Sequence, residues 1–306
     1  MWQPDADWHP LPGGTGPSTL GVWRAAVGDR AVVVKRVAPP VEGDPSSLSD
    51  PRHFAYWRRG ADVASFGLVE DTPGMTGAPT EVEEDAEGIT LVTEWVEDAA
   101  NSGLFVAMSL GRFAAAELAH VRWLARDQFR DRLGRVERRG GWPTLARTTV
   151  ADVADELWRR REHFLGLLDA LPQVAQHGDP TPGNLPGRRI DPGGEDRLVA
   201  LDWSSLGYGP AGGDLGLYLL TAREEFEPLL DAYLLGLPEG RVSRAEATLG
   251  AQVTAVYTAM SRAEWALARV AGGEGALAAK FRHPAVAPHL LALQRQFAAI
   301  EALLDA

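Results

Sequence analysis

The chain has 306 residues, of which 45% are hydrophobic and 24% are charged. Such a composition is typical of globular proteins and excludes wholesale disorder, and the length suits one large domain or two packed lobes. A net charge of −12 argues against nucleic acid as a partner, because surfaces that bind phosphate backbones are basic.

Features of membrane and disulfide-bonded proteins are absent from the sequence. No apolar run reaches the roughly 18–20 residues of a membrane span, and the polar start over residues 1–14 lacks the apolar stretch of a secretory signal. Without cysteine, the chain has no disulfides, thiolate metal sites or cysteine nucleophiles. We therefore expect a cytoplasmic protein, a monomer or homodimer, with no membrane partner.

The first third of the chain is rich in turns and short β-like runs. Two pairs of apolar runs, each around a short turn, predict β-hairpins: 20–27 with 31–37, and 80–83 with 89–96. Between the hairpins, a run that begins with proline and holds aromatic residues predicts a helix over residues 51–66.

Helical spacing of apolar residues dominates the rest of the chain. It predicts helices over residues 104–129, 150–171, 223–235, 243–270 and 288–304. A compact segment rich in Gly, Pro and Asp, residues 176–214, interrupts them. The pattern indicates an α+β fold with a small β-rich N-terminal lobe over 1–97 and a larger helical lobe over 98–306. Irregular segments in such a lobe often carry function.

The irregular segment holds polar residues that suit phosphoryl transfer. It contains His177, Asp179 and Asn184, and Asp202 comes directly after an apolar strand at 198–201. Phosphoryl transfer needs one carboxylate beside the acceptor hydroxyl, and further oxygen ligands that hold Mg²⁺ on the nucleotide phosphates. An Asp, an Asn and a second Asp in one segment provide that set.

The N-terminal lobe supplies matching parts for a nucleotide. A loop before the first clear strand contains Gly13, Gly14, Gly16 and Ser18. Its glycines would let backbone N–H groups approach phosphates closely. Lys35 is one of only two lysines in the chain and ends an apolar strand, where its ammonium could reach phosphates. Neither a P-loop motif nor a Rossmann motif is present.

The order and spacing of His177-Gly178-Asp179, Asn184 and Asp202-Trp203 resemble the aminoglycoside phosphotransferase/choline kinase-like family of small-molecule kinases. The resemblance spans most of the chain and implies the two-lobed protein-kinase-like fold. It also implies a donor nucleotide, ATP with GTP not excluded, together with Mg²⁺. The acceptor would be a hydroxyl of an aminoglycoside, aminocyclitol, sugar, amino alcohol or natural-product scaffold.

The resemblance also assigns roles to individual residues. Asp179 would be the catalytic base, and His177 would brace its loop. Asn184 and Asp202 would hold Mg²⁺, and Lys35 would bind the phosphates of the nucleotide.

Two further segments receive roles from the resemblance. The backbone around Glu94, Trp95 and Val96 would meet the nucleotide base at the hinge between the lobes. Asp214 lies in the stretch that follows the metal-binding Asp in this family, and it would be a structural support.

One departure from the family pattern concerns the partner of Lys35. The family places a Glu on the N-lobe helix at or near position 60, where this chain has Gly60. Asp62 or Glu70 could substitute, or the helix could be displaced. A catalytically weakened or repurposed nucleotide-binding or regulatory protein is therefore the alternative to an active kinase. An enzyme of this fold with other chemistry on an activated phosphate is a minor third possibility.

An acidic stretch, residues 224–227 with Asp231, has two interpretations. It could meet a cationic acceptor, or it could be a solvated helix start, which Glu favours through the helix dipole. We favour the second, because most of the excess acid lies away from the expected acceptor site. Residues 1–98 hold 17 of the 42 acidic residues against 7 of the 30 basic ones, which leaves 25 against 23 in the remainder.

Overall fold

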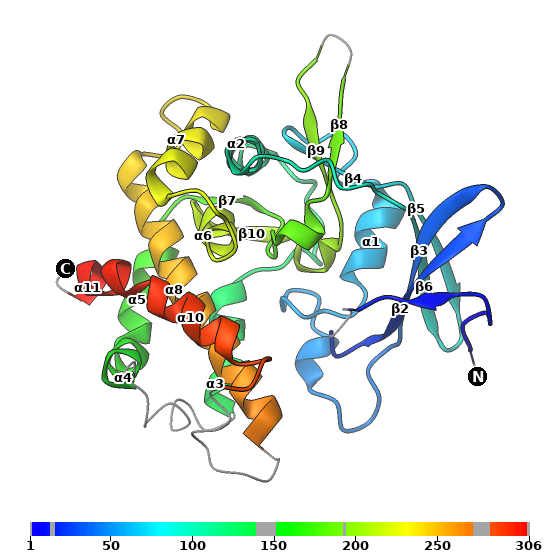
Figure 1. Cartoon of the computed structure of the whole chain (residues 1–306), viewed down its shortest axis with the longest axis horizontal. Helices are drawn as coiled ribbons and strands as arrows, with labels where there is room; N and C mark the ends of the chain where they lie inside the picture. The colour runs from blue at the N-terminus through cyan, green and yellow to red at the C-terminus, as the bar shows by residue number, and fades with distance from the viewer. Residues whose placement is uncertain (1, 13–15, 139–150, 192–193, 272–281, 305–306) are drawn as a thin grey trace.

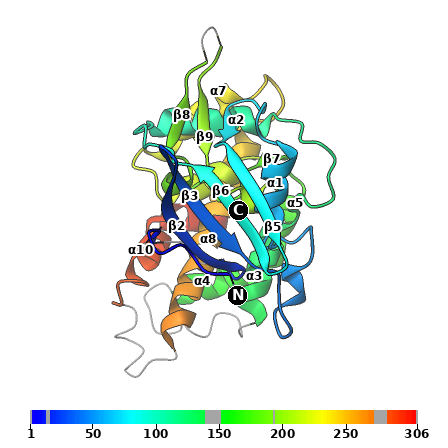
Figure 2. The same ribbon diagram turned by 90° about the vertical axis from the view of Figure 1, so that its right-hand side faces the viewer.

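The computed structural model describes residues 2–12, 16–138, 151–191, 194–271 and 282–304, and its first third is built around an antiparallel sheet. The strand order is β1-β2-β3-β6-β5, and Figure 2 shows the last four side by side. Their bounds are β1 (His9–Pro10), β2 (Thr19–Val27), β3 (Arg30–Val37), β5 (Thr80–Asp85) and β6 (Gly88–Glu94). Both predicted hairpins, β2–β3 and β5–β6, are confirmed.

The helix predicted over 51–66 is shorter than expected. Helix α1 (Arg59–Phe66) packs its apolar side against the sheet, and the preceding residues 51–58 form turns. The reason is the buried guanidinium of Arg59. Carbonyl groups of the turns bind this guanidinium, so they do not accept the hydrogen bonds of a helix. The guanidinium donates to the carbonyl oxygens of Pro51, His53 and Phe54.

A second, three-stranded sheet joins the two parts of the chain. Strand β4 (Met75–Gly77) lies parallel to β9 (Arg197–Ala200), which pairs with β8 (Gly187–Arg189) on its other side. Strands β7 (Gln173–Gln176) and β10 (Gly207–Pro210) form a separate antiparallel pair. Because β4 precedes residue 97 and β9 follows residue 98, this pairing joins the two lobes expected from the sequence. The position of the lobe boundary between residues 97 and 98 stays a prediction.

Helices make up most of the second part of the structure (Figure 1). They are α2 (Gly103–Ala114), α3 (Gln128–Arg138), α4 (Ala151–Arg159), α5 (Arg161–Asp169), α6 (Gly213–Leu219), α7 (Phe226–Gly236), α8 (Arg244–Ala271), α10 (Ala287–Arg295) and α11 (Phe297–Leu304). Helix α8 is central, because α5, α6, α10 and α11 all pack against it around one apolar core. The expected α+β arrangement, a β-rich part followed by a helical part, is confirmed. None of the described helices combines the length and apolarity needed to cross a membrane.

Three predicted helices are interrupted. The run 104–129 is divided by an irregular stretch in which Ala125 forms a bridge with Gly207 and donates its N–H to the carbonyl of Leu206. Backbone groups that pair with the β10 segment cannot also continue a helix. The runs 150–171 and 288–304 are broken only at Arg160 and Gln296.

Candidate active site

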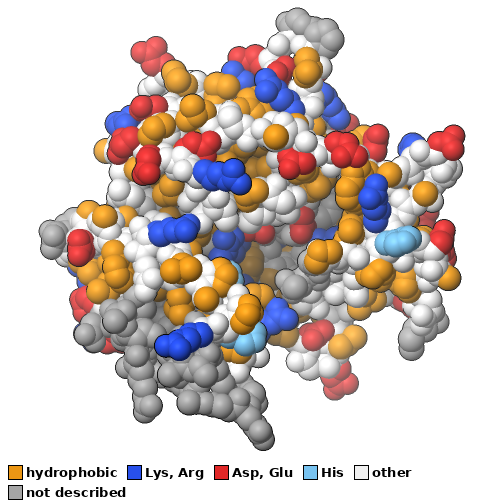
Figure 3. Space-filling model, in the orientation of Figure 1, with side chains coloured by type: hydrophobic (Ala, Val, Ile, Leu, Met, Phe, Trp, Pro, Cys, Tyr) orange, Lys and Arg blue, Asp and Glu red, His pale blue; other side chains and the backbone are white. Residues whose placement is uncertain are grey.

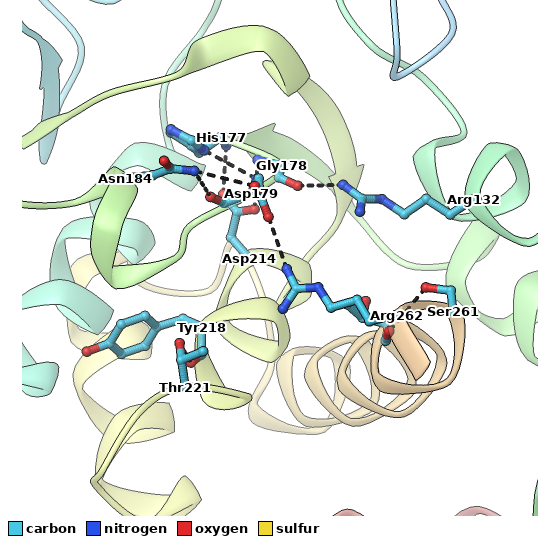
Figure 4. A network of polar contacts seen from close by, with 11 residues as sticks. Arg132, His177, Gly178, Asp179, Asn184, Asp214, Tyr218, Thr221, Ser261 and Arg262 are labelled. Atoms are coloured by element: carbon cyan, nitrogen blue, oxygen red, sulfur yellow. Dashed lines mark hydrogen bonds and ion pairs between the residues drawn. The ribbon is translucent and has the colours of Figure 1, made fainter. Parts of the chain in front are cut away.

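The buried carboxylate of Asp214 binds the backbone of the loop after β7 (Figure 4). Asp214 accepts the backbone N–H of His177 at 2.7 Å and that of Gly178 at 3.0 Å. Burial raises the pKa of Asp214 to about 6. Gly178 has φ +84°, and a Cβ there would lie 2.5 Å from the carbonyl oxygen of Ser205. Only glycine therefore fits at position 178. The contacts of Asp214 support the structural role expected of it.

The imidazole of His177 links this loop to the segment that precedes Asp202. The backbone N–H of Asp179 donates to His177 Nδ1 at 3.2 Å, so the ring hydrogen is on Nε2, which donates to the carbonyl of Leu201 at 2.9 Å. The ring is fully buried and lies 4.6 Å from that of Trp203. The bracing role expected of His177 stays a prediction, which these contacts support.

Asn184 lies between the two aspartates. Its Nδ2 donates to the backbone carbonyl of Asp179 at 2.9 Å and is 3.4 Å from the Asp179 carboxylate. Its own backbone carbonyl accepts the N–H of Leu201 at 2.8 Å, which brings it beside Asp202. Asp202 has the left-handed φ of 55°, a conformation that is uncommon outside glycine and often occurs at functional sites. Because the nitrogen of the amide is used internally, its oxygen is left for a cation.

Lys35, from the middle of β3, forms an ion pair with Asp202. The Nζ–Oδ1 distance is 2.9 Å, and the side chains are 21% and 40% exposed, so a ligand can reach both. Burial opposes ionisation of Asp202, but the neighbouring Lys35 ammonium holds the pKa of the carboxyl below its usual range. Asp62 does not replace the expected Glu partner, because it pairs with Arg58 at 3.0 Å. Glu70 lines the cavity described next.

A cavity of about 820 Å³ lies between the N-terminal sheet and the helical part, and Figure 3 shows that face hollowed between them. Six of the predicted site residues line it: Lys35, Glu94, Trp95, Val96, Asn184 and Asp202. Gly60 also lines it, and a Cβ on Gly60 would meet no atom within 4 Å, so the absent Glu leaves open space.

The glycine-rich loop is only partly described. Its flanking residues Leu11 and Pro12 line the cavity. Gly16 and Ser18 do not belong to the described lining, and Gly13 and Gly14 lie outside the described residues. Their assignment to phosphate binding stays a prediction.

The hinge segment offers one backbone donor. The N–H of Trp95 is used by the carbonyl of Ala31 at 3.0 Å, and the ring of Trp95 is covered by the Arg24 guanidinium, 4.4 Å from its centroid. The N–H of Val96 has no hydrogen bond to any described residue.

Sequence reasoning missed two arginines beside Asp179. Arg262 of α8 places Nη2 3.0 Å from Asp179 Oδ1, and Arg132 of α3 donates to the carbonyl of Gly178 at 3.0 Å. Burial lowers the pKa of Arg132, and Asp179 partly opposes this effect. Arg262 follows Asp179 by 83 positions, and no motif or spacing marks it.

The acidic stretch on the helical part has structural partners. Glu224 Oε1 accepts the N–H of Gly103, the first residue of α2, at 2.7 Å. Glu227 and Asp231 both pair with Arg244 on the surface. Glu227 lies in the first turn of α7, as the interpretation of a solvated helix start expects, whereas Glu224 binds the start of α2 instead.

The donor set suits Mg²⁺ bound together with phosphates. Within the described residues, no group of three or more His, Asp or Glu side chains could hold a metal alone. Asn184 and Asp202 offer one amide oxygen and one carboxylate. Mg²⁺ is commonly held by one or two such ligands, with substrate phosphates and water completing its octahedron. The residues therefore fit a nucleotide-bound Mg²⁺.

Comparison with known proteins gives a family and a fold. The family model described as "Phosphotransferase enzyme family" (APH) matches residues 55–249, more than half of the chain. A comparison of the sequence with curated proteins gave no match.

Solved structures are similar over nearly the whole chain. Choline kinase LicA from Streptococcus pneumoniae has 13% identity and a TM-score of 0.57, with 97% of this chain and 93% of that chain covered. The GDP complex of aminoglycoside 2′-phosphotransferase-IIIa has 11% identity and a TM-score of 0.58, covering 95% and 92%. Spectinomycin phosphotransferase APH(9)-Ia with ADP and spectinomycin has 10% identity and a TM-score of 0.56, covering 94% and 93%. At such identities the likeness shows the fold, and it confirms the expected kinase-like architecture.

Proposed function

Because the chain belongs to the phosphotransferase enzyme family (APH), we propose that it is a kinase that transfers a phosphoryl group from ATP to a hydroxyl of a small molecule. One observation carries the proposal. Lys35, Asn184 and Asp202 line a single cavity, and Asp179 lies next to Asn184. GTP is a second possible donor, since a related structure holds GDP.

The nucleotide would occupy the cavity with its base at the hinge. The N–H of Val96 would donate to the base, and the ammonium of Lys35 would contact the phosphates. Asn184 and Asp202 would hold Mg²⁺, which when bound neutralises phosphate charge. The ion pair between Lys35 and Asp202 holds both side chains at the cavity before the nucleotide arrives.

Asp179 would act on the acceptor. Its carboxylate would orient the acceptor hydroxyl and take its proton as the oxygen attacks the γ-phosphorus. The new O–P bond forms while the bond from the γ-phosphorus to the oxygen of ADP breaks. The contacts of Asp214 and His177 fix the loop backbone, so that little ordering remains to be done when the substrates bind.

The alternative is a nucleotide-binding protein without transfer activity. The observation behind it is Gly60, which leaves Lys35 without the acidic partner that the family places on the N-lobe helix. The pair between Lys35 and Asp202 gives the ammonium another anchor in this chain, and this favours the enzyme.

An assay of ADP release with ATP and Mg²⁺ tests the proposal. The full chain is screened against amino sugars, sugar acids, sugar phosphates, nucleosides, choline-like amines and macrolides. On any acceptor found, Asp179→Asn should lower kcat by roughly 10²–10⁴-fold, the usual contribution of a general base. Asp231→Asn is the matched control, because Asp231 is an exposed partner of Arg244.

Full activity of Asp179→Asn would exclude the assigned role. Thermal shift tests nucleotide binding, which both functions require, when no acceptor is found. A Mg²⁺-dependent rise in Tm with ATP supports nucleotide binding in this cavity, whereas no rise in the presence of both contradicts it.

A further inference from the structure

Positive charge gathers on one side of Asp179. Figure 4 shows Asn184 on one side of the carboxylate, and Arg262 and Arg132 on the other. Asn184 belongs to the nucleotide cavity, so the two arginines lie on the side from which an acceptor would reach Asp179. Their donors point at the loop itself: Arg262 at the Asp179 carboxylate, and Arg132 at the Gly178 carbonyl.

Within the described residues, the one ion pair of Arg262 is with Asp179. Half-buried His289 from α10 lies close enough that its pKa is lowered, first by burial and then by the charge of Arg262. His289 is therefore neutral at pH 7, so it brings no negative charge to the guanidinium. Two further acids act on Arg132, and both already accept backbone N–H groups: Asp214 from His177 and Gly178, and Asp131 from Phe54.

Ammonium groups would find few partners at this side of the site. Three of the four acids of the acidic stretch are held elsewhere, since Glu224 caps α2 and Glu227 and Asp231 pair with Arg244. A polycationic acceptor would bring like charges against Arg132 and Arg262, and like charges brought together are repulsive.

Arg262 has donors to spare for a ligand. A guanidinium carries five N–H groups in a planar fork, and within the described residues one of them binds Asp179. The fork matches a carboxylate or a phosphate with two parallel hydrogen bonds. An anionic group held in this way would lie beside Asp179. The Asp179 carboxylate could then contact a neighbouring hydroxyl of the same molecule.

We propose that the acceptor is an anionic alcohol, a hydroxyl compound that carries a carboxylate or phosphate, and that Arg262 binds this anionic group with support from the charge of Arg132. The inference rests on the proposed kinase function. It names Arg262 as the residue that determines acceptor charge.

The test uses four sugars that share one pyranose ring and differ in charge: glucuronate, glucose 6-phosphate, glucose and glucosamine. Their effect on Tm is measured with the full chain in saturating ADP and Mg²⁺. We expect the two anionic sugars to raise Tm and the neutral and cationic ones to leave it unchanged. A response to glucuronate alone assigns a carboxylate acceptor, and one to glucose 6-phosphate alone assigns a phosphate acceptor.

Variants of two arginines on the same helix assign the effect. Arg262→Gln should weaken binding of the anionic sugar roughly 10- to 150-fold, the loss expected for hydrogen bonds to a charged group. Arg262→Lys keeps the charge without the fork and should lose less. Arg244→Gln is the control, because Arg244 is exposed at the far end of α8 and pairs with surface acids. Melting curves without ligand verify that each variant folds.

Each outcome decides for or against the inference. Stronger binding of glucosamine than of glucuronate, no response to either anion, or an anion response that survives Arg262→Gln would overturn it. The proposed kinase function fails separately, through the absence of any rise in Tm with ADP and Mg²⁺ alone. That result would remove the inference as well.

Discussion

Replacement of Arg59 by methionine should destabilise the chain severely. Its side chain is fully buried, and burial lowers the pKa of the guanidinium to about 10, so it is still charged at neutral pH. The guanidinium donates to five carbonyl oxygens, those of Pro51, His53, Phe54, Trp123 and Ser204. These bonds join α1 to the turns before it, to the loop before α3 and to the segment after Asp202.

The size of the effect follows from the acceptors that lose a donor. Three of the bonds, to His53, Phe54 and Trp123, lie in buried surroundings. Each buried carbonyl left without a partner costs about 1–3 kcal/mol. Relief of the buried charge offsets part of this sum, so we expect a loss of about 3–5 kcal/mol.

Urea unfolding measures the loss. Arg59→Lys, which keeps the charge and three donors, should lose less than Arg59→Met. Arg58→Met is the neighbouring control: its guanidinium pairs with Asp62 and Glu84 near the surface, so the loss should stay within about 1 kcal/mol. A loss below about 1 kcal/mol for Arg59→Met would refute the reasoning that this residue holds the junction together.

Three further substitutions test separate parts of the structure. Asp214→Asn reports on pH: because burial raises the pKa of Asp214 to about 6, its contribution to stability is present below about pH 4 and is lost as the pH rises through 6. The unfolding free energy of the wild type minus that of the variant should therefore fall between pH 4 and pH 7, and a constant difference would contradict this. Gly60→Ala should raise the unfolding free energy by about 0.5–1 kcal/mol, since the added Cβ meets open space within α1; measurable destabilisation in urea would show that the space is not free. Glu224→Ala should lower it by about 0.5–2 kcal/mol, because the N–H of Gly103 loses its acceptor at the start of α2, and an unchanged urea midpoint would show that the cap contributes nothing.

Local pattern was enough for the hairpins and for the loop that carries Asp179. The turn Gly28-Asp29 joins two apolar runs, and these runs form the β2–β3 hairpin in the structure. Helix ends were harder to predict, because apolar spacing alone does not reveal where a backbone leaves the helix to pair elsewhere. The bridge between Ala125 and Gly207 is such a case.

Sequence by itself therefore determined the family resemblance, the two kinds of lobe and the order of Lys35, Asp179, Asn184 and Asp202, because these depend on short spacings and local turn chemistry. Tertiary structure alone decided which charges meet. Lys35 pairs with Asp202 across 167 positions, and Arg262 reaches Asp179 across 83. Contacts over such separations leave no periodicity in the chain, since they depend on how whole elements pack. The charge of the acceptor side, on which the substrate inference rests, became visible only when α8 was packed against the loop.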